Sequence, residues 1–429
     1  MTINNEHKKL NFLSEREQNQ ACLNSAEHEK NQGRKVLNVP NLRFKEFQGE
    51  WEEKRLSEIA DLFKGNGISK EQLTDTGEPC ILYGELYTKY KSEIISDIFS
   101  KTDIDTRKLV KSKANDVIIP CSGETAVDIA TARCVPYDNI LLGGDLNIIR
   151  LYDCDGSFMS YQLNGKRKYD IAKVAQGVSV VHLYGDHLKG VKTYNPCLEE
   201  QKKIVRLLSL LDERIATQNK IIDKLQSLIK GINQRVFKNS GNNYKLGEIC
   251  EIRSGYSGSQ LLSKKGLKVS RIETISGHKV NLERVGYVAP FESSENYKLQ
   301  VGDILFSNIN SVEYIGNTAF IDKDYDLYHG MNLLRLTPNH MVVIPFYLYL
   351  LLNTNRMLNR FKAVCNKAVS QASINQTELG KTVIQIPPIK TQKQICELYQ
   401  ALYTKLETES HTKSLFQNQK QYLLRQMFI

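Results

Sequence analysis

The sequence lacks the short motifs that commonly organise an enzyme active site. It contains no H-E-x-x-H, no G-x-S-x-G and no G-x-G-x-x-G, which argues against the common zinc proteases, serine hydrolases and dinucleotide-binding enzymes. The nearest match to a phosphate-binding loop is Gly380-Lys-Thr382, but Asn375 occupies the earlier position that must be glycine. These absences favour a protein that holds and recognises a partner over an enzyme.

Cysteine and histidine are too scattered to predict a metal site or a disulfide framework. The nine cysteines are odd in number and include no C-x-x-C pair. The eight histidines form no ligand-like pairs, and isolated ones such as His182 and His329 are more often structural than catalytic. We therefore expect reduced thiols, no bound metal and a cytoplasmic location.

Long hydrophobic runs are also missing. The most apolar stretch, Val342–Leu352, is shorter than the roughly 20 residues that span a bilayer, and Pro345 interrupts it. We interpret it as the start of a buried helix. Met1–Gln20 is polar and does not resemble a signal peptide, so we expect a soluble protein.

Charge gives a mild indication of the partner. The formal net charge is +10 and the isoelectric point is near 8.9, which favours a polyanion. The basic residues are spread along the chain, so this signal is weak on its own.

An internal repeat organises the chain. NPCLEEQKKIVRLLSLLDERI (Asn195–Ile215) and IPPIKTQKQICELYQALYTKL (Ile386–Leu406) share a proline, the pattern Gln-Lys-x-Ile and leucines at helical spacing. Other matching pairs follow in the same order along the two halves: 54–65 with 244–255, 115–120 with 302–307, 129–132 with 316–319, 146–151 with 331–336, and 177–183 with 368–374. The protein is therefore predicted to contain one structural plan twice.

Each half consists of a mixed segment with short apolar runs of strand length, followed by a long helix that begins after a proline. The predicted fold class is α+β, with two similar α/β recognition domains separated by a long antiparallel two-helix coiled coil and related by a pseudo-two-fold repeat. The predicted divisions are a polar N-terminal extension (1–39), poorly ordered or loosely helical, a first domain (40–195), a central helix (196–239), a second domain (240–386) and a C-terminal helix (387–429).

Both helices carry a seam with alternating steps of four and three residues, which is typical of a coiled coil. The apolar seam positions are Ile204, Leu208, Leu211, Ile215, Ile222, Leu225, Ile229, Ile232 and Val236 in the first helix, and Ile395, Tyr399, Leu402, Leu406, Phe416, Leu423 and Met427 in the second. Each helix is the obvious partner of the other. Two alternatives remain open: the helices could be cores of separate helical domains, and the polar seam residues Gln218, Glu409, Lys413 and Lys420 could fix the register or face solvent or another protein.

The stretch NVPNLRFKEFQGEWEEKRLSEIAD (Asn38–Asp61) resembles the opening of a type I restriction-modification specificity subunit. The two helix starts resemble that family as well, as do the helix ends INQRVF and LLRQMF. The resemblance covers 38–429, and its strongest element is the order domain, helix, domain, helix. The extension before residue 38 and the more polar second helix depart from the family pattern.

The resemblance implies that each domain reads one half of an interrupted double-stranded DNA sequence and that the paired helices act as spacer and docking surface. It also implies two modification subunits, which methylate adenine with S-adenosylmethionine, and two restriction subunits, which use ATP and Mg²⁺ to translocate and cleave DNA. The chain itself would have no catalytic residue and no cofactor.

Candidate DNA-contacting residues come from chemistry, because recognition domains differ in the targets they read. Asn308 and Asn310 in the stretch Ser307–Ser311 follow a predicted strand, and asparagine can bond adenine bidentately. An ordinary turn is the alternative interpretation. The other candidates in predicted turns are Ser122 and Thr125 in the counterpart loop Cys121–Thr125, Ser179 and His182, Ser307, and Lys367, Ser370 and Gln371.

Basic clusters are candidates for phosphate contacts, which position a protein on DNA without reading its sequence. They comprise Arg107, Lys108, Lys111 and Lys113, then Lys166, Arg167 and Lys168, and, late in the second domain, Arg356, Arg360 and Lys362. A solvated charged surface is the alternative for each cluster.

Two rival functions make different predictions. A coiled-coil scaffold that binds only proteins would show no sequence-specific, salt-dependent DNA binding together with a modification subunit. A stand-alone nuclease or methyltransferase would cleave DNA or bind S-adenosylmethionine as the isolated chain.

Overall fold

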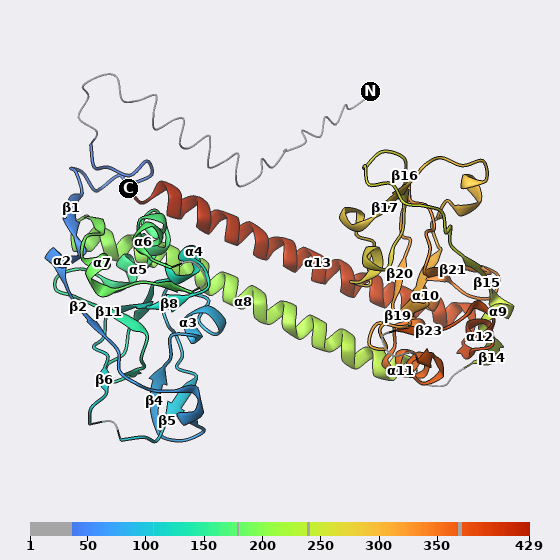
Figure 1. The fold of residues 1–429 in the computed structure, drawn as a ribbon, viewed down its shortest axis with the longest axis horizontal. Helices are drawn as coiled ribbons and strands as arrows, with labels where there is room; N and C mark the ends of the chain where they lie inside the picture. The colour runs from blue at the N-terminus through green and yellow to red at the C-terminus, as the bar shows by residue number, and fades with distance from the viewer. Residues whose placement is uncertain (1–36, 106, 178–179, 238–240, 368–370) are drawn as a thin grey trace. The chain divides into compact units, whose positions relative to one another are not determined.

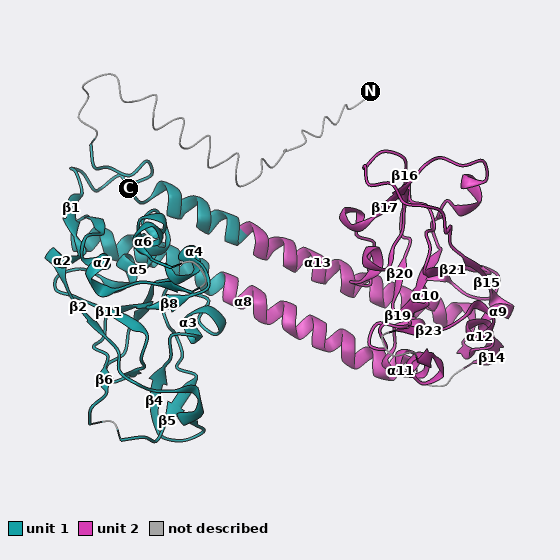
Figure 2. Cartoon of the chain, in the orientation of Figure 1, with its two compact units in different colours: residues 1–214, 416–429 teal, residues 215–415 magenta. Residues whose placement is uncertain are grey.

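The computed structural model describes residues 37–105, 107–177, 180–237, 241–367 and 371–429. The chain divides into two compact units, Met1–Arg214 with Phe416–Ile429, and Ile215–Leu415 (Figure 2). The unit boundary crosses both long helices, α8 (Leu198–Val236) and α13 (Ile389–Gln426). Most of the predicted N-terminal extension lies outside the described residues.

The first unit is built on a four-stranded antiparallel sheet in the order β2-β11-β7-β9 (Figure 1). A five-stranded sheet in the order β3-β5-β4-β10-β6 and the two-stranded pairs β1-β13 and β8-β12 complete it. The strands are β1 (Glu52–Arg55), β2 (Ala60–Lys64), β3 (Leu73–Thr74), β4 (Glu78–Ile81), β5 (Ser100–Thr102), β6 (Val110–Lys111), β7 (Asp116–Pro120), β8 (Ser122–Gly123), β9 (Arg133–Val135), β10 (Leu141–Leu142), β11 (Leu146–Leu151), β12 (Val181–His182) and β13 (Lys192–Asn195). The helices, besides parts of α8 and α13, are α2 (Leu56–Ile59), α3 (Glu85–Thr88), α4 (Ala126–Ile129), α5 (Gly156–Asn164), α6 (Lys168–Val174) and α7 (Gly185–Lys189), with the short η1 (Lys70–Gln72).

Strand β7 shows why this sheet forms. Its five residues are all buried. Val117 and Ile119 belong to one hydrophobic cluster, whereas Ile118 belongs to another. Side chains alternate between the two faces of a strand, so a β-branched Val-Ile-Ile run covered on both faces is stable only as the inner strand of a sheet.

The second unit repeats this plan on the sheet β15-β21-β18-β20. Its strands are β14 (Asn242–Lys245), β15 (Cys250–Ser254), β16 (Leu267–Val269), β17 (Gly286–Val288), β18 (Ile304–Ser307), β19 (Ile309–Asn310), β20 (Thr318–Phe320), β21 (Leu333–Pro338), β22 (Asn366–Lys367), β23 (Ala372–Ser373) and β24 (Val383–Ile386). The helices, besides parts of α8 and α13, are α9 (Leu246–Ile249), α10 (Pro345–Leu352), α11 (Asn355–Val364) and α12 (Gln376–Gly380), with the short η2 (Ile272–Ile275), η3 (Leu282–Arg284) and η4 (Ser294–Tyr297).

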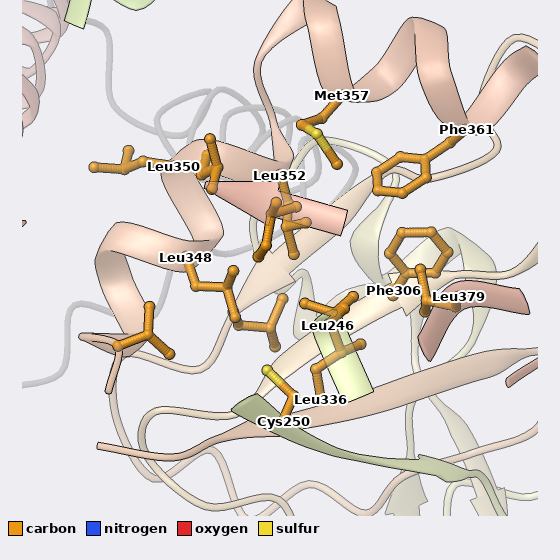
Figure 3. Close-up of a cluster of buried hydrophobic side chains, with 14 of the residues drawn as sticks. Leu246, Cys250, Phe306, Leu336, Leu348, Leu350, Leu352, Met357, Phe361 and Leu379 are labelled. Atoms are coloured by element: carbon orange, nitrogen blue, oxygen red, sulfur yellow. The ribbon is translucent and has the colours of Figure 1, made fainter. Parts of the chain in front are cut away.

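The core of the second unit gathers apolar side chains from its sheet and from helices α10 and α11. Figure 3 shows Phe306 of β18 beside Phe361 of α11, with ring centroids 5.0 Å apart and almost perpendicular. Helix α10 begins at Pro345, and six of its residues are buried. This confirms that the most apolar run of the sequence starts a buried helix rather than a membrane span.

The matching sheet orders, together with the long helices, confirm the predicted α+β fold with an internal repeat. The two units differ in their peripheral strands. The first carries the five-stranded sheet, whereas β16 and β17 form only a two-stranded antiparallel pair in the second. Among the described residues, none of the helices combines the length and apolarity needed to cross a membrane.

Within each unit, α8 and α13 pack against each other in antiparallel directions. In the first unit, Ile204 and Leu208 near the start of α8 share a cluster with Leu423 and Met427 near the end of α13. In the second unit, Ile229 near the end of α8 shares a cluster with Tyr399 near the start of α13. All of the apolar seam positions named above are buried or half-buried.

The glutamine of the repeated Gln-Lys-x-Ile pattern makes the same hydrogen bonds at the start of both long helices. Gln201 donates through Nε2 to the carbonyl of Pro196 and accepts through Oε1 from the backbone N–H of Asp155, both at 2.9 Å. Gln392 makes the same two bonds with Pro387 and Ile344, both at 2.8 Å. Each buried amide therefore fixes a long helix to the domain beside it, through the segment that precedes α5 or α10.

Candidate nucleic-acid interface

In the first unit, two loops that are far apart in the sequence meet as a small antiparallel ribbon. Strand β8 pairs with β12, with Ser122 opposite His182 and Gly123 opposite Val181. The ribbon continues directly from the buried strand β7, because the backbone N–H of Leu183 bonds the carbonyl of Cys121 at 2.8 Å. We call β8, β12 and the residues that connect β8 to α4 the first ribbon. Ser179 lies outside the described residues.

The second unit contains the equivalent ribbon. Strand β19 pairs with β23, with Ile309 opposite Ser373 and Asn310 opposite Ala372, and β22 pairs with the other edge of β23. We call β19, β22, β23 and the residues that follow β19 the second ribbon. It places the stretch that contains Asn308 and Asn310 in the same small sheet as Lys367 of β22, with β23 between them. Ser370 lies outside the described residues, and Gln371 is exposed directly before β23.

The structure assigns several of the predicted contact residues to local structural roles. Thr125 caps α4, since its hydroxyl oxygen accepts from the backbone N–H of Asp128 at 3.1 Å. The Asn310 side chain donates to the hydroxyl of Ser307 at 3.1 Å and accepts from the next backbone N–H, and Ser307 itself is buried. These bonds are the turn contacts that short polar residues commonly make. Asn308 is half-buried, and its Oδ1 has no partner among the described residues.

A cleft of about 750 Å³ opens beside the first ribbon. One wall consists of Ser122, Gly123 and Glu124 from the ribbon, and the other comes from α3 and its neighbours Tyr83 and Lys91. The Tyr87 hydroxyl donates to the Ser122 carbonyl at 3.0 Å and so ties the walls together. Burial raises the pKa of Tyr87, which keeps this hydroxyl protonated and able to donate. A concave surface with aromatic and polar groups suits the edge of a base better than a phosphate.

Two segments of the chain, residues 48–227 and 240–415, match the family model described as "Type I restriction modification DNA specificity domain". The chain belongs to this family of specificity subunits. It is 24% identical over 417 residues to the type I restriction enzyme MjaVIII specificity subunit of Methanocaldococcus jannaschii, which covers 89% of this chain and 94% of that protein. It is also 38% identical over 188 residues to a type I restriction enzyme MjaX specificity subunit of the same organism. This match covers 44% of that protein.

Two solved structures share the fold. The S subunit of a type I restriction-modification system from M. genitalium has a TM-score of 0.59 at 17% identity, with coverage of 91% of this chain and 99% of that one. A chain from a study of complex assembly in a type I system has a TM-score of 0.56 at 18% identity, with coverage of 88% and 97%. Specificity subunits are the non-catalytic DNA-recognition components of these systems, and they act with DNA and the other subunits.

The basic residues predicted to contact DNA in the first domain of this specificity subunit differ in whether they form ion pairs within the chain. Lys108 and Lys113 are exposed, whereas Lys111 forms an ion pair with Glu78 at 2.9 Å. Arg107 is exposed and forms an ion pair with Asp105 at 2.8 Å. These surface pairs are weak enough to exchange for a phosphate.

The cluster at the α5–α6 junction is mainly structural. The Arg167 guanidinium lies over the Tyr194 ring, 5.2 Å from its centroid, and pairs with Asp170 at 3.2 Å. Burial, together with the nearby Arg133, lowers the pKa of the largely enclosed Lys168. Lys166 alone is exposed, so it is the member of this cluster best placed to meet a phosphate.

In the second domain, Arg356, Arg360 and Lys362 lie on α11 as predicted from the helical spacing. Arg356 and Arg360 are exposed one turn apart, and Arg360 donates to the carbonyl of Val383 at 2.5 Å. Arg356 also lines a cleft of about 520 Å³ with Lys230 and Phe237 near the end of α8. Lys367 is exposed on the second ribbon and has no ion pair with any described residue.

No group of three or more histidine, cysteine or acidic side chains able to hold a metal ion occurs in the part of the chain that the structure describes. Burial raises the pKa of the Cys121 thiol to about 11, so this cysteine beside the first ribbon is protonated and a poor nucleophile. Burial also lowers the pKa of His329 to about 4, and the ring bonds the Leu333 carbonyl at 2.9 Å, which is the structural role expected of a lone histidine.

Sequence reasoning missed the cleft residues Tyr83, Lys91 and Glu124. Tyr83 and Lys91 lie some 30 to 40 residues before the first ribbon in the sequence and meet it only through the fold. Glu124 is within the predicted reading loop, but it carries the wrong charge for a search that looks for basic and amide side chains. Its acceptor chemistry towards bases with an amino group is the signal that could have found it.

Proposed function

We propose that each of the two domains reads one half of an interrupted DNA target through its ribbon, and that α8 and α13 set the gap between the halves. The observation that carries this proposal is the identical register of the two ribbons within one chain of the specificity family. The first ribbon has two strands, and a two-stranded ribbon is narrow enough to enter the major groove of duplex DNA, where all four base pairs can be distinguished.

The paired helices support a spacer role. Each helix is an uninterrupted element of 38 or 39 residues, which corresponds to roughly 60 Å at about 1.5 Å per residue. When two reading domains share one chain, binding of the first raises the effective concentration of the second at a target with the matching gap. The gap thereby becomes part of the specificity.

We infer that the same helices dock two modification subunits, and that two restriction subunits join the assembly. In this arrangement the partner subunits use S-adenosylmethionine, ATP and Mg²⁺, and the specificity chain supplies only recognition. Exposed apolar side chains on the helices, Leu210 and Tyr422 in the first unit and Leu228, Leu398 and Leu415 in the second, offer contact area for such partners.

The test is selection of a bound sequence by the full chain assembled with its modification subunits. A random duplex library is incubated with the complex, and bound DNA is sequenced over several rounds at two salt concentrations. We expect two short specific elements separated by a fixed unspecific gap, with affinity that falls as salt rises because lysine and arginine release counterions from the phosphates.

Failure to select any interrupted motif would contradict the proposal. Binding only to the partner subunits, with no DNA selectivity, would instead support a protein-binding scaffold. A matched control replaces exposed Lys108 and Lys113 with glutamine. This change should weaken binding to all sequences alike and lower the salt dependence, because phosphate contacts carry no sequence information.

A further inference from the structure

The first ribbon leaves only two of the side chains from 121 to 125 free to meet a ligand. Cys121 is buried and Thr125 caps α4, while Gly123 has no side chain. Glu124 is exposed and forms no hydrogen bond or ion pair with any residue that the structure describes. Ser122 is half-buried, with its carbonyl held by Tyr87 and its hydroxyl free among the described residues. Elimination thus leaves the Ser122 hydroxyl and the Glu124 carboxylate.

The surroundings of Glu124 suit a base better than a cation. It lines the cleft together with Tyr83 and Val180, whose side chains are 39% and 53% exposed. Exposed aromatic and branched aliphatic side chains match the flat or methylated edge of a base. The chain has a net charge of +10, and an unpaired carboxylate lowers its attraction to phosphate. Glu124 can therefore favour DNA recognition only through the hydrogen bonds that its carboxylate accepts from the bases.

The second ribbon has an equivalent position. Ser122 opposite His182 corresponds to Ile309 opposite Ser373 in the two registers. Two residues further on, Glu124 therefore corresponds to Ser311, which is also exposed. A carboxylate occupies this position in one domain and a hydroxyl in the other, so the two domains present different chemistry to DNA at the same place in the fold.

We propose that positions 124 and 311 determine base specificity in the two halves of the target. The Glu124 carboxylate accepts a hydrogen bond from the exocyclic amino group of cytosine or adenine in the major groove. It repels the O6 of guanine and the O4 of thymine, because two acceptors face each other there. The Ser311 hydroxyl both donates and accepts, so it discriminates less strongly. This inference rests on the proposed function, because it assigns residues to its reading step.

The experiment repeats the selection with Glu124→Gln and Glu124→Ala in the full chain assembled with its modification subunits. Wild-type protein should require cytosine or adenine at one position of one half-site. Glu124→Ala should lose about tenfold of that preference or more, the scale of one good base contact, with the other half-site unchanged. Glu124→Gln should shift the preference at the same position towards adenine, because the glutamine amide accepts from N6 of that base and donates to its N7. Ser311→Ala should alter only the other half-site. Both positions are exposed, so the variants should keep the wild-type melting temperature.

The matched control is Asp153→Asn. Asp153 is exposed and follows the end of β11 that lies away from the first ribbon, because Leu146 at the other end pairs with Pro120. The substitution Asp153→Asn removes one negative charge, as the Glu124 variants do, and should leave the base preferences of both half-sites unchanged. If wild type selects an interrupted motif and the Glu124 variants select the same bases with equal preference, the inference is overturned while the proposed function stands. If wild type selects no interrupted motif, both the proposed function and this inference are wrong.

Discussion

The Lys420 ammonium of α13 lies 2.5 Å from the Asp212 carboxylate of α8 in the first unit, and it also bonds Glu93. The Tyr161 hydroxyl donates to the same Asp212 at 2.6 Å. All of these groups are buried or nearly so. A polar position of the predicted seam thus joins both helices to the domain beside them.

Replacing Lys420 with methionine should destabilise the first unit by about 3–5 kcal/mol, because two carboxylates would stay buried without a cation. Urea denaturation of the full chain measures this change. The control is Lys405→Met, which removes an exposed lysine that pairs with half-buried Glu409 on the same helix and should cost about 1 kcal/mol or less. Equal costs for the two variants would show that the buried cluster adds nothing beyond a surface pair.

Replacing Gln392 with alanine should cost about 1–3 kcal/mol, because the buried N–H of Ile344 and the carbonyl of Pro387 would lose their partner. Gln201→Ala should cost a similar amount in the first unit. Thermal unfolding measures both, with Gln394→Ala as the control, since Gln394 is exposed two residues further along α13. A cost for Gln394→Ala as large as that for Gln392→Ala would contradict this role.

The pH dependence of the second unit should reflect His329. Its pKa is lowered from 6.5 to about 4 by burial, so the unfolded chain binds more protons than the folded one between these values. The free energy of unfolding is therefore not reduced by His329 above about pH 6.5, and it falls by roughly 3 kcal/mol as the pH drops towards 4. The variant His329→Gln should lose this part of the acid sensitivity, as seen in denaturation at pH 7 and pH 4.5. Exposed His340→Gln should behave like wild type, and an unchanged pH slope in His329→Gln would exclude this histidine as the cause.

Shortening both helices by one heptad should shorten the DNA gap. Deleting 215–221 and 406–412 removes equal lengths around the contact of Gln218 with Glu409, so the seam register is kept. Each deletion shortens its helix by about 10 Å, which is on the order of three base pairs. Selection with the assembled complex should recover the same half-sites at the smaller gap. Selection of the original gap would show that the helices do not set it.

The sequence predicted the architecture well because the architecture depends on periodicity. The seam that contains Ile204 and Ile229 and the prolines before both helices are local signals, and the repeat doubles each of them. The pairing of Ser122 with His182 was not predicted, because it joins two loops that lie about 60 residues apart in the sequence.

The site was harder to predict because partners within the fold decide which side chains are free. Nothing in the sequence distinguishes Arg167, which lies over Tyr194, from exposed Lys166 one position earlier. Thr125 and Asn310 have suitable chemistry for DNA contact, yet local backbone groups already occupy their polar atoms. Tyr83 enters the cleft only through long-range folding, which no local pattern encodes.

The first unit takes its core from both ends of the described chain. The ring of Trp51 lies 6.4 Å from that of Phe428, and the backbone N–H of Leu42 bonds the carbonyl of Gln426 at 2.8 Å. The second unit, by contrast, is one continuous segment. On the ribosome, the second unit can therefore complete its folding before the first unit does. The first unit keeps the Trp51 indole and neighbouring rings uncovered until the last turns of α13 are synthesised. The N-terminal part of the nascent chain therefore needs protection from aggregation for the longest time.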